Sequence, residues 1–418
     1  PVSAADGQIT PFLDALFTAA SASCVTGLVT VSTAVHWSVF GKCVILLLIQ
    51  IGGLGFMSVA AIASFVLRRT ITLHERMVMS AGLNLSDGGG IVRLTRRVLF
   101  GTFIIEGTGA VLLSCRFVPH YGFPKGITMG VFHAVSAFCN AGFDLMGTPD
   151  DPFQSLIGWA EDPLVNITVM ALIVLGGLGF FVWSDVWDKH SFCRLRLHTK
   201  IVLTATAGLL LFGFGWTLLF EWSNPATLGA FDTPHKLLAA AFESVTLRTA
   251  GFNTIDLGAL TGPSQAVSCL LMFIGGSPGS TAGGIKTVTA AVLVLTAISA
   301  FCGRTTVSAF GRTIAPRSIM NAVTLLMAGG VLCLVGACAI AGIEDAPFHQ
   351  CLFEAVSAFG TVGVSMGLTP TLSAASRVIL IVMMYMGRVG VLTLGVAVFM
   401  RRREPPRLKY PDADVFIG

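Results

Sequence analysis

Charged side chains are scarce in this 418-residue chain, where they make up 11% of the residues against 54% hydrophobic ones. Soluble domains carry about 25% charged residues, so the composition excludes a soluble globular protein. The mean hydropathy of +0.81 indicates an integral membrane protein instead. Segments of roughly ten residues with alternating polarity, typical of an outer-membrane barrel, are missing, so helical spans are expected.

Catalytic and metal-binding motifs are missing as well. The ten cysteines are scattered without any C-x-x-C spacing and are interpreted as small apolar residues within helices. No H-E-x-x-H motif or recurring Ser/His/Asp set occurs, which argues against a membrane enzyme. The stretch GSTAGGIKT resembles a Walker A loop, but Ile285 stands between its Gly and its Lys and no soluble strand precedes it. The sequence therefore predicts no enzyme, no cofactor held by this chain and no nucleic-acid partner.

Long apolar segments predict seven membrane-spanning helices. Six are continuous, at 37–67, 97–115, 166–187, 198–222, 319–342 and 377–400, and the seventh is an interrupted run at 264–299. Four shorter apolar segments cannot cross a bilayer and run into Gly-bearing loops, at 11–23, 129–138, 236–247 and 347–358. We expect them to be re-entrant helices, which a bilayer tolerates where protein or water covers the backbone.

The basic residues predict the orientation of these spans. The loops at 68–97, 185–200 and 304–317, together with the tail after residue 400, hold 18 of the 26 Lys and Arg but only seven acids. Short cytoplasmic loops retain positive charge. This side is therefore expected to be cytoplasmic, with the C-terminus, and the four Gly-bearing loops open to the outside.

Four related segments recur along the chain. Each begins with Phe, has Ser or Thr four residues later and ends on Gly plus an apolar residue: FTAASASCVTGL (17–28), FHAVSAFCNAGF (132–143), FESVTLRTAGF (242–252) and FEAVSAFGTVGV (353–364). The span that follows also repeats, as GGLGF at 52–56 and 176–180, GGSPG at 275–279 and GRVGV at 387–391. Such self-similarity predicts four copies of one structural unit.

The predicted fold class is therefore an all-α integral membrane protein. It has four pseudo-repeats of helix, re-entrant pore helix, filter loop and helix around a central pore, at 1–70, 91–190, 198–303 and 317–403, followed by a cytoplasmic tail at 404–418. The first repeat lacks its leading helix in this chain. Seven spans with the C-terminus inside would leave the N-terminus outside without a signal to carry it there. We therefore expect that Pro1 is not the native start.

Four such units around an axis bring their Gly loops to one point. Glycine adopts backbone angles closed to other residues and has no side chain to block a lumen. Consecutive carbonyls can then face inward and replace a cation's hydration shell. The predicted filter comprises Val25, Thr26, Gly27, Asn140, Ala141, Gly142, Thr249, Ala250, Gly251, Thr361, Val362 and Gly363. The cation is expected at the backbone carbonyls of Thr26, Gly27, Asn140, Gly142, Gly251, Thr361 and Gly363.

The residues alone specify only a dehydrated monovalent cation. An alternative interpretation is that the glycines serve close helix packing, and this alternative stays open for the GGLGF pairs. A second alternative is a transporter of small organic solutes with a broken helix. Such folds usually show two inverted repeats, whereas four copies run in the same orientation here.

Taken together, the VTGL, NAGF, RTAGF and TVG loops, GGSPGSTAGGIKT and the late MGRVG resemble the Trk/Ktr/HKT superfamily of potassium transporters. The similarity is greatest to the bacterial KtrB-type membrane subunit and covers essentially the whole chain. It implies channel-like potassium uptake across the bacterial cytoplasmic (inner) membrane, by a homodimer on a cytoplasmic ring of nucleotide-binding RCK-type subunits. ATP or ADP would act only through that ring. In the plant branch a Ser at the first filter Gly accompanies sodium transport; Gly27 stands here, which implies K⁺ as the transported ion.

The polar stretch 275–287 interrupts the seventh span directly after the third filter loop. Non-helical backbone at that depth persists only where protein covers it or where it lines a water-filled cavity. A Gly/Ser/Thr loop can swing aside, and the resemblance implies that it is a gate. Its predicted residues are Gly275, Gly276, Ser277, Pro278, Gly279, Ser280, Thr281, Ala282, Gly283, Gly284 and Lys286, with Arg388 from a later span.

Arg388 is a charge within a predicted span, which costs about 2.5–3.5 kcal/mol on insertion scales and requires a partner. We expect its guanidinium to bind carbonyls or hydroxyls of the loop and to hold the gate shut, with pairing to Glu106 as the alternative. His133, Glu243 and Glu354 are expected near the outer ends of the short helices, as caps or as attractants for cations. Arg248 is expected to brace the third filter loop from behind.

Overall fold

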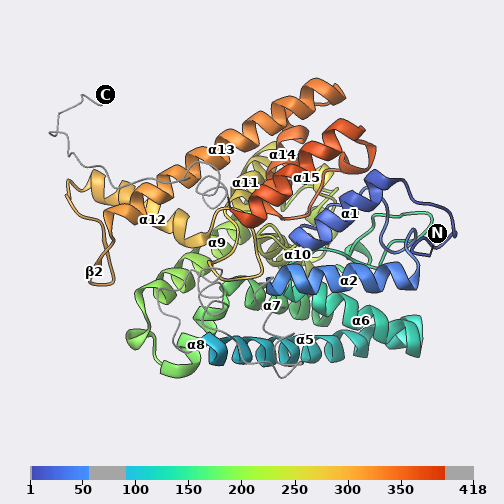
Figure 1. Ribbon diagram of the computed structural model, residues 1–418, viewed down its shortest axis with the longest axis horizontal. Coiled ribbons are helices and arrows are strands. Elements are labelled where there is room, and N and C mark those ends of the chain that lie inside the picture. Colours follow the sequence, from blue (N-terminus) through green and yellow to red (C-terminus); the bar gives the residue numbers. More distant parts are fainter. Residues whose placement is uncertain (1, 56–90, 391–418) are drawn as a thin grey trace.

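The structure is a computed structural model that describes residues 2–55 and 91–390 (Figure 1). The helices of the first half are α1 (Phe12–Cys24), α2 (Val39–Leu54), α5 (Ile91–Tyr121), α6 (Phe123–Phe138), α7 (Pro163–Leu178), α8 (Phe180–Lys189) and α9 (Leu197–Glu221). Those of the second half are α10 (Thr233–Thr246), α11 (Gly262–Phe273), α12 (Thr287–Phe301), α13 (Pro316–Glu344), α14 (Phe348–Gly360) and α15 (Ala374–Val389). The predicted parts 56–70, 391–403 and 404–418 lie outside the described residues.

One small hairpin lies between α12 and α13. Its strands β1 (Ser308–Ala309) and β2 (Arg312–Thr313) pair antiparallel, with Ser308 opposite Thr313. The remaining regular elements in the described ranges are single 3₁₀ turns: η1 (Ile157–Trp159), η2 (Phe192–Arg194), η3 (Leu228–Ala230), η4 (Leu257–Ala259) and η5 (Thr369–Thr371).

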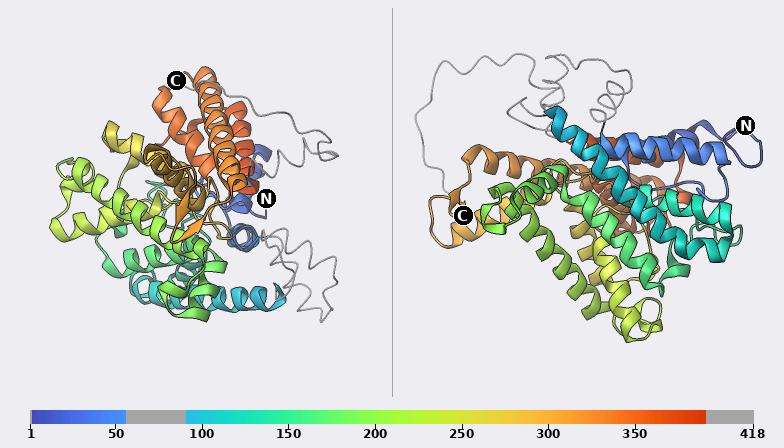
Figure 2. Two further views of the ribbon diagram at one scale, coloured as in Figure 1. Left: turned by 90° about the vertical axis from the view of Figure 1, so that its left-hand side faces the viewer. Right: turned by 90° about the horizontal axis from the view of Figure 1, so that it is seen from below.

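Three of the described helices are long and apolar enough to cross a membrane: Thr95–Tyr121, Leu197–Glu221 and Pro316–Glu344. Only about a third or less of each apolar stretch is buried against other parts of the chain. Large apolar side chains such as Leu211 therefore point outward, which suits contact with lipid. Figures 1 and 2 show α5 and α13 at opposite sides of the molecule, with α10 between them.

The prediction of one continuous helix at 166–187 is wrong. The chain forms α7 and α8 there, and their axes differ by 91°. The cause is Gly179, the fourth residue of GGLGF, whose φ of +94° ends α7. Gly55 and Gly390 stand at the equivalent positions with φ of +79° and +90°, and they end α2 and α15. A left-handed glycine stops a helix because it turns the next carbonyl away from the helix axis.

The predicted interruption of the seventh span is present. Helix α11 ends at Phe273 and α12 begins at Thr287, so the polar stretch between them is not helical. The four short segments predicted from apolarity also form helices, namely α1, α6, α10 and α14. Helix α6 begins six residues before the predicted segment, because Pro124 in its first turn is pre-set for a helical start.

The repeated Phe of each short helix lies in the hydrophobic interior. Phe17, Phe242 and Phe353 are fully buried, and Phe132 is almost fully buried. Phe132 and Phe242 belong to one hydrophobic cluster, and Phe17 and Phe353 belong to a second. Burying an aromatic side chain of this size contributes roughly 1.5–3 kcal/mol. The invariant first letter of the four copies is therefore explained by packing.

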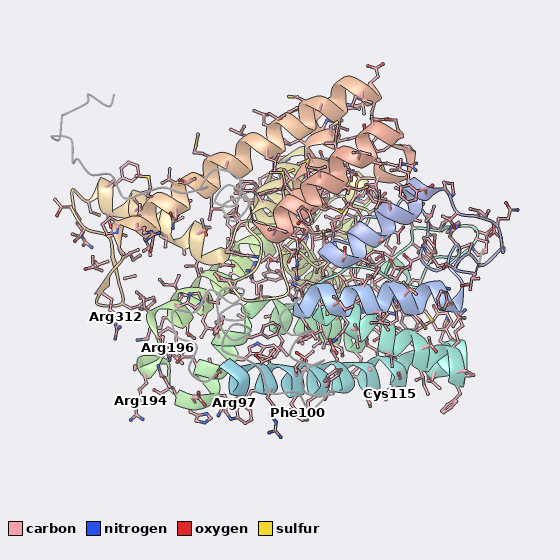
Figure 3. All side chains as sticks on the ribbon, in the orientation of Figure 1. Arg97, Phe100, Cys115, Arg194, Arg196 and Arg312 are labelled. Atoms are coloured by element: carbon pink, nitrogen blue, oxygen red, sulfur yellow. The ribbon has the colours of Figure 1, made fainter. Side chains whose placement is uncertain are left out.

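Basic residues gather at one end of the molecule. Figure 3 shows Arg194, Arg196 and Arg312 together at the end away from the N-terminus. Arg97 forms an ion pair with Asp188 at the end of α8, with 2.9 Å between Nη1 and Oδ1. Arg97, Arg194, Arg196 and Arg312, from three of the basic loops, thus lie on one side of the fold.

We expect Phe353→Ala to lower the free energy of unfolding by about 3–5 kcal/mol, because it removes a fully buried ring from the centre of α14. Phe348→Ala in the same helix is the matched control, since its ring is 45% exposed. Thermal unfolding in detergent should show a much lower midpoint for the first variant only. Equal midpoints would contradict the packing role of the repeated Phe.

Candidate functional site

Four glycines, one from each predicted repeat, meet at one place. A Cβ atom at Gly142 would lie 2.6 Å from the Cα of Gly251, and one at Gly251 would lie 2.7 Å from the carbonyl oxygen of Val362. Gly27 packs in the same way against Gly142, and Gly363 packs against Gly27. The contacts thus run in order through the four loops and return to the first. The backbones of four segments that are far apart in the sequence form one closed ring.

The backbone of these loops takes angles that few residues adopt. The four ring glycines have φ of +96°, +68°, +84° and +92° in chain order. The residue two positions before each glycine is left-handed as well: Val25, Asn140, Thr249 and Thr361, with φ between +51° and +69°. Such angles cost about 1–3 kcal/mol for a non-glycine residue and persist only where the surroundings enforce them. Three of these four residues are β-branched, for which a positive φ is rarest.

A hydroxyl group from each short helix holds its own loop. It belongs to the Ser or Thr that the four sequence copies share. In three copies it donates to the carbonyl after the ring glycine: Ser136 to Phe143 (2.7 Å), Thr246 to Phe252 (2.6 Å) and Ser357 to Val364 (2.7 Å). In the first copy Ser21 Oγ instead accepts from the N–H of Gly27 (3.0 Å). The sequence pattern showed this residue without revealing its purpose.

The first glycine of each GGLGF-type motif allows a close helix contact. A Cβ atom at Gly52, Gly176 or Gly387 would collide with the carbonyl oxygen of Ser23, Phe138 or Phe359, respectively. Each of these carbonyls lies at the end of a short helix. These three glycines therefore allow close helix packing, which was the alternative interpretation of the motif.

The stretch 275–287 lies directly against the glycine ring. A Cβ atom at Gly284 would lie 3.1 Å from the Cα of Gly360, and one at Gly283 would meet the side chain of Thr361 in the fourth loop. On the third loop, a Cβ at Gly275 would lie 3.2 Å from Cγ2 of Thr249. The predicted gate residues and the predicted filter residues are thus neighbours.

Backbone hydrogen bonds shape this stretch. Its two ends meet, because Gly275 N donates to Ile285 O (2.8 Å) and Thr287 N donates to Gly276 O (3.0 Å). Its middle lies on the bend between α7 and α8, where Phe180 N donates to Gly279 O (2.9 Å). The stretch has a defined fold that depends on a few contacts.

Arg388 connects the stretch to the end of α2. Its guanidinium donates to the carbonyl oxygen of Thr281 and to that of Gly52. It lies in the last turn of α15, which ends at Val389. Glu106, the alternative partner, is held instead by Gln50 Nε2 at 3.1 Å from both carboxylate oxygens.

Two further cations also bind carbonyls of the stretch. Lys286 Nζ donates to Ala282 O (2.6 Å), and Arg248 Nη2 donates to Thr287 Oγ1 (3.0 Å) and reaches Gly275 O at 3.4 Å. Within the described residues, neither these two side chains nor Arg388 forms an ion pair. Three positive charges therefore lie around the stretch with carbonyl and hydroxyl partners alone.

The expectation that His133, Glu243 and Glu354 lie at the outer ends of the short helices is wrong. They lie in the middle or second half of α6, α10 and α14, and all three are buried. His133 and Glu354 contact backbone N–H groups of the loops that follow the ring glycines, at Leu145 and Met366. They are therefore neither helix caps nor exposed charges that attract cations.

The family model described as "TrkH: Cation transport protein" matches residues 2–404 of this chain. The chain belongs to this family. Its sequence is 40% identical over 423 residues to the potassium/sodium uptake protein NtpJ of Enterococcus hirae, covering 100% of this chain and 92% of that protein. It is 42% identical over 407 residues to the Ktr system potassium uptake protein B of Bacillus subtilis, covering 97% and 90%.

The fold is similar to the crystal structure of the potassium transporter TrkH from Vibrio parahaemolyticus. The TM-score is 0.71 at 16% sequence identity, over 93% of this chain and 78% of that one. The resemblance found in the sequence motifs is confirmed. As a member of a family of cation transport proteins, the chain is a multi-pass membrane transporter and not an enzyme.

We expect Gly387→Ala to lower the free energy of unfolding by about 1–3 kcal/mol, because its Cβ would collide with the backbone carbonyl of Phe359. Gly330→Ala in α13 is the control, since a Cβ there meets nothing within 4 Å. The control should be neutral or stabilising, as Ala favours a helix over Gly. A stable Gly387→Ala protein in thermal unfolding would contradict the close helix contact.

Proposed function

We propose that the chain takes up potassium through a pore whose selectivity filter is the ring of four glycine loops. The observation that carries this proposal is the closed ring itself, with four positive-φ glycines and no side chain between neighbouring backbones. Such a ring presents backbone carbonyls to its centre at the depth where an ion must lose its water. The four loops and the helices around them correspond to the four pseudo-repeats of the sequence.

The filter carbonyls are those of the twelve residues 25–27, 140–142, 249–251 and 361–363. Potassium is assigned as the ion because all four ring positions are Gly and because Ktr protein B of Bacillus subtilis is named as a potassium uptake protein. The relative NtpJ of Enterococcus hirae is named as a potassium/sodium uptake protein. A ring whose backbones touch one another leaves no room for a larger organic solute. Transport of such a solute is therefore the less favoured function.

We propose that the stretch 275–287 is the gate and that Arg388 holds it closed. The stretch lies against the ring, so it blocks the path of an ion that leaves the filter. Arg388 fixes it to the end of α2, and Lys286 and Arg248 add positive charge around the same path. A cation below the filter therefore meets both backbone and positive charge while the stretch stays in place.

We propose further that the basic end of the molecule faces the cytoplasm of a bacterium and that the glycine loops open to the outside. The concentration of arginines at this end follows the positive-inside rule. That end also offers a surface for an RCK-type regulatory ring that binds ATP or ADP, beneath a homodimer of this chain. The similarity to a Ktr system protein supports these partners.

We expect Gly27→Ser to reduce the preference for rubidium over sodium, because a side chain at Gly27 would collide with the carbonyl of Ala141 and displace the ring. The measurement is uptake of both ions into proteoliposomes, with Gly107→Ser in α5 as the control, since a Cβ there meets nothing within 4 Å. Equal uptake of both ions by the wild type would overturn the assignment of potassium. An unchanged ratio in Gly27→Ser would overturn the filter.

We expect Arg388→Ala to raise rubidium uptake by about tenfold in the absence of any activating partner. Loss of hydrogen bonds to a charged group costs the closed state about 1.5 kcal/mol or more, which corresponds to at least a tenfold change in the ratio of open to closed protein. Arg317→Ala, an exposed arginine at the start of α13, removes the same charge without touching the stretch. Arg388 is not a latch if both variants conduct like the wild type.

A further inference from the structure

The chain that leaves the glycine ring in the fourth loop is held by a buried carboxylate. Glu354 Oε1 accepts hydrogen bonds from Met366 N (3.1 Å) and Ser365 Oγ (2.5 Å). Its other oxygen, Oε2, accepts from Thr369 Oγ1 (2.6 Å). Met366 is the third residue after the ring glycine Gly363. One side chain of α14 thus binds three points of the segment that follows the filter.

The second loop is held at the equivalent place by a different side chain. His133 occupies the position of Glu354, and its Nε2 lies 3.3 Å from Leu145 N, the third residue after Gly142. Because that N–H is a donor, Nε2 must accept, and Nδ1 carries the proton that it donates to Met129 O at 2.8 Å. The imidazole is therefore held as one neutral tautomer.

The first loop is held at the equivalent place by Asp14, which lies one helical turn before the position equivalent to Glu354. Thr18 stands at the equivalent position, and its short side chain donates to the carbonyl of Asp14 within α1. Asp14 itself accepts from Thr30 Oγ1 at 2.8 Å, and Thr30 is the third residue after Gly27. Asp14 is fixed in turn by an ion pair with Arg377 of α15.

The third loop has the residues for such a contact and does not make it. Glu243 occupies the equivalent position and is 1% exposed, yet neither of its carboxylate oxygens has a hydrogen-bond partner among the described residues. Thr254, the third residue after Gly251, is fully buried, and its hydroxyl has no partner there either. The third loop is held instead at Asn253 N, by Ser155 Oγ of a neighbouring loop (3.1 Å).

We infer that Glu354, His133 and Asp14 are positioning residues for ion selectivity, and that the third loop, which is attached at Asn253 to a neighbouring loop and not at its third residue to its own short helix, is the more compliant side of the filter. This inference rests on the proposed filter. A loop that Ser357 holds at Gly363 and Val364, and that Glu354 holds at Ser365, Met366 and Thr369, keeps its carbonyls at a fixed distance from the centre. Such a loop resists contraction around an ion smaller than potassium. Loss of the far attachment lets the loop close in and favours sodium.

The compliant loop lies in the repeat that also contains the stretch 275–287. Thr249 of the third loop contacts Gly275, the first residue of that stretch. Three stiff loops and one compliant loop thus allow the stretch to move while most of the ring keeps its spacing.

Four proteins test this inference in proteoliposomes, by rubidium and sodium uptake: wild type, Glu354→Ala, Glu354→Gln and Glu243→Ala. We expect Glu354→Ala to lower the rubidium-to-sodium ratio about tenfold, since a contact to a charged acceptor at each of three points is lost. Glu354→Gln should stay within about twofold of wild type, because its amide oxygen still accepts from Met366 N and Ser365 Oγ. Glu243→Ala should also stay within about twofold, since Glu243 holds nothing.

The ratio of the two ions is the decisive readout, because a merely misfolded transporter loses uptake of both ions together. If Glu354→Ala does not insert, the double variant Ser365→Ala, Thr369→Val removes two of the three contacts from the loop side, and it should lower the ratio at least about threefold. An unchanged ratio in these variants, or an equal fall in Glu243→Ala, overturns the inference. Gly27→Ser in the same assay distinguishes failure of the proposed filter from failure of this inference. If only Gly27→Ser alters selectivity, the filter is supported and the positioning role of Glu354 is wrong.

Discussion

Backbone that leaves helical geometry inside a membrane needs a partner for every N–H and C=O group, and this requirement governs the structure. The chain meets it by placing each glycine loop at the end of a short helix and by pressing four such units together. The Ser or Thr of each short helix binds its own loop, and glycines of the following helix let the backbones approach to contact distance. The ring, the bend at Gly179 and the fold of the stretch 275–287 all depend on that close approach.

Strain is the cost of this arrangement. Left-handed Val25, Thr249 and Thr361 are unfavourable alone. The preceding helix holds the N–H groups of Val25 and Thr361, and Asn140 of the second loop donates to the hydroxyl of Thr249. Backbone angles of this kind occur where function requires a geometry that an unstrained chain does not adopt. The strain is confined to a few residues, while the repeated Phe side chains of the short helices provide the burial that offsets it.

Much of the organisation was predictable from internal repetition, because four copies of one pattern reveal which positions share a role. The short helices, the interrupted span and the carbonyl partners of Arg388 follow from apolarity, from glycine content and from the need of a charge within a span for a partner. The bend at Gly179 was not predictable from apolarity, since the residues immediately before and after it, 170–178 and 180–183, are all apolar. The contacts of His133 and Glu354 were not predictable from the sequence either. Their hydrogen bonds join α6 and α14 to loop residues, and the periodicity of a helix does not predict the path of the loop that follows it.

The three cations around the stretch 275–287 have a consequence for how the transporter responds to its membrane. Lys286 belongs to the stretch itself, and its ammonium group donates to the carbonyl of Ala282. A segment that moves while carrying such a charge also moves it through the electric field of the bilayer. Each elementary charge that crosses the full field is worth about 2.3 kcal/mol per 100 mV. If the proposed gate opens by moving Lys286, its opening would therefore depend on voltage, and Lys286 would act as a gating charge. The membrane potential would then oppose or favour opening according to the direction in which Lys286 travels.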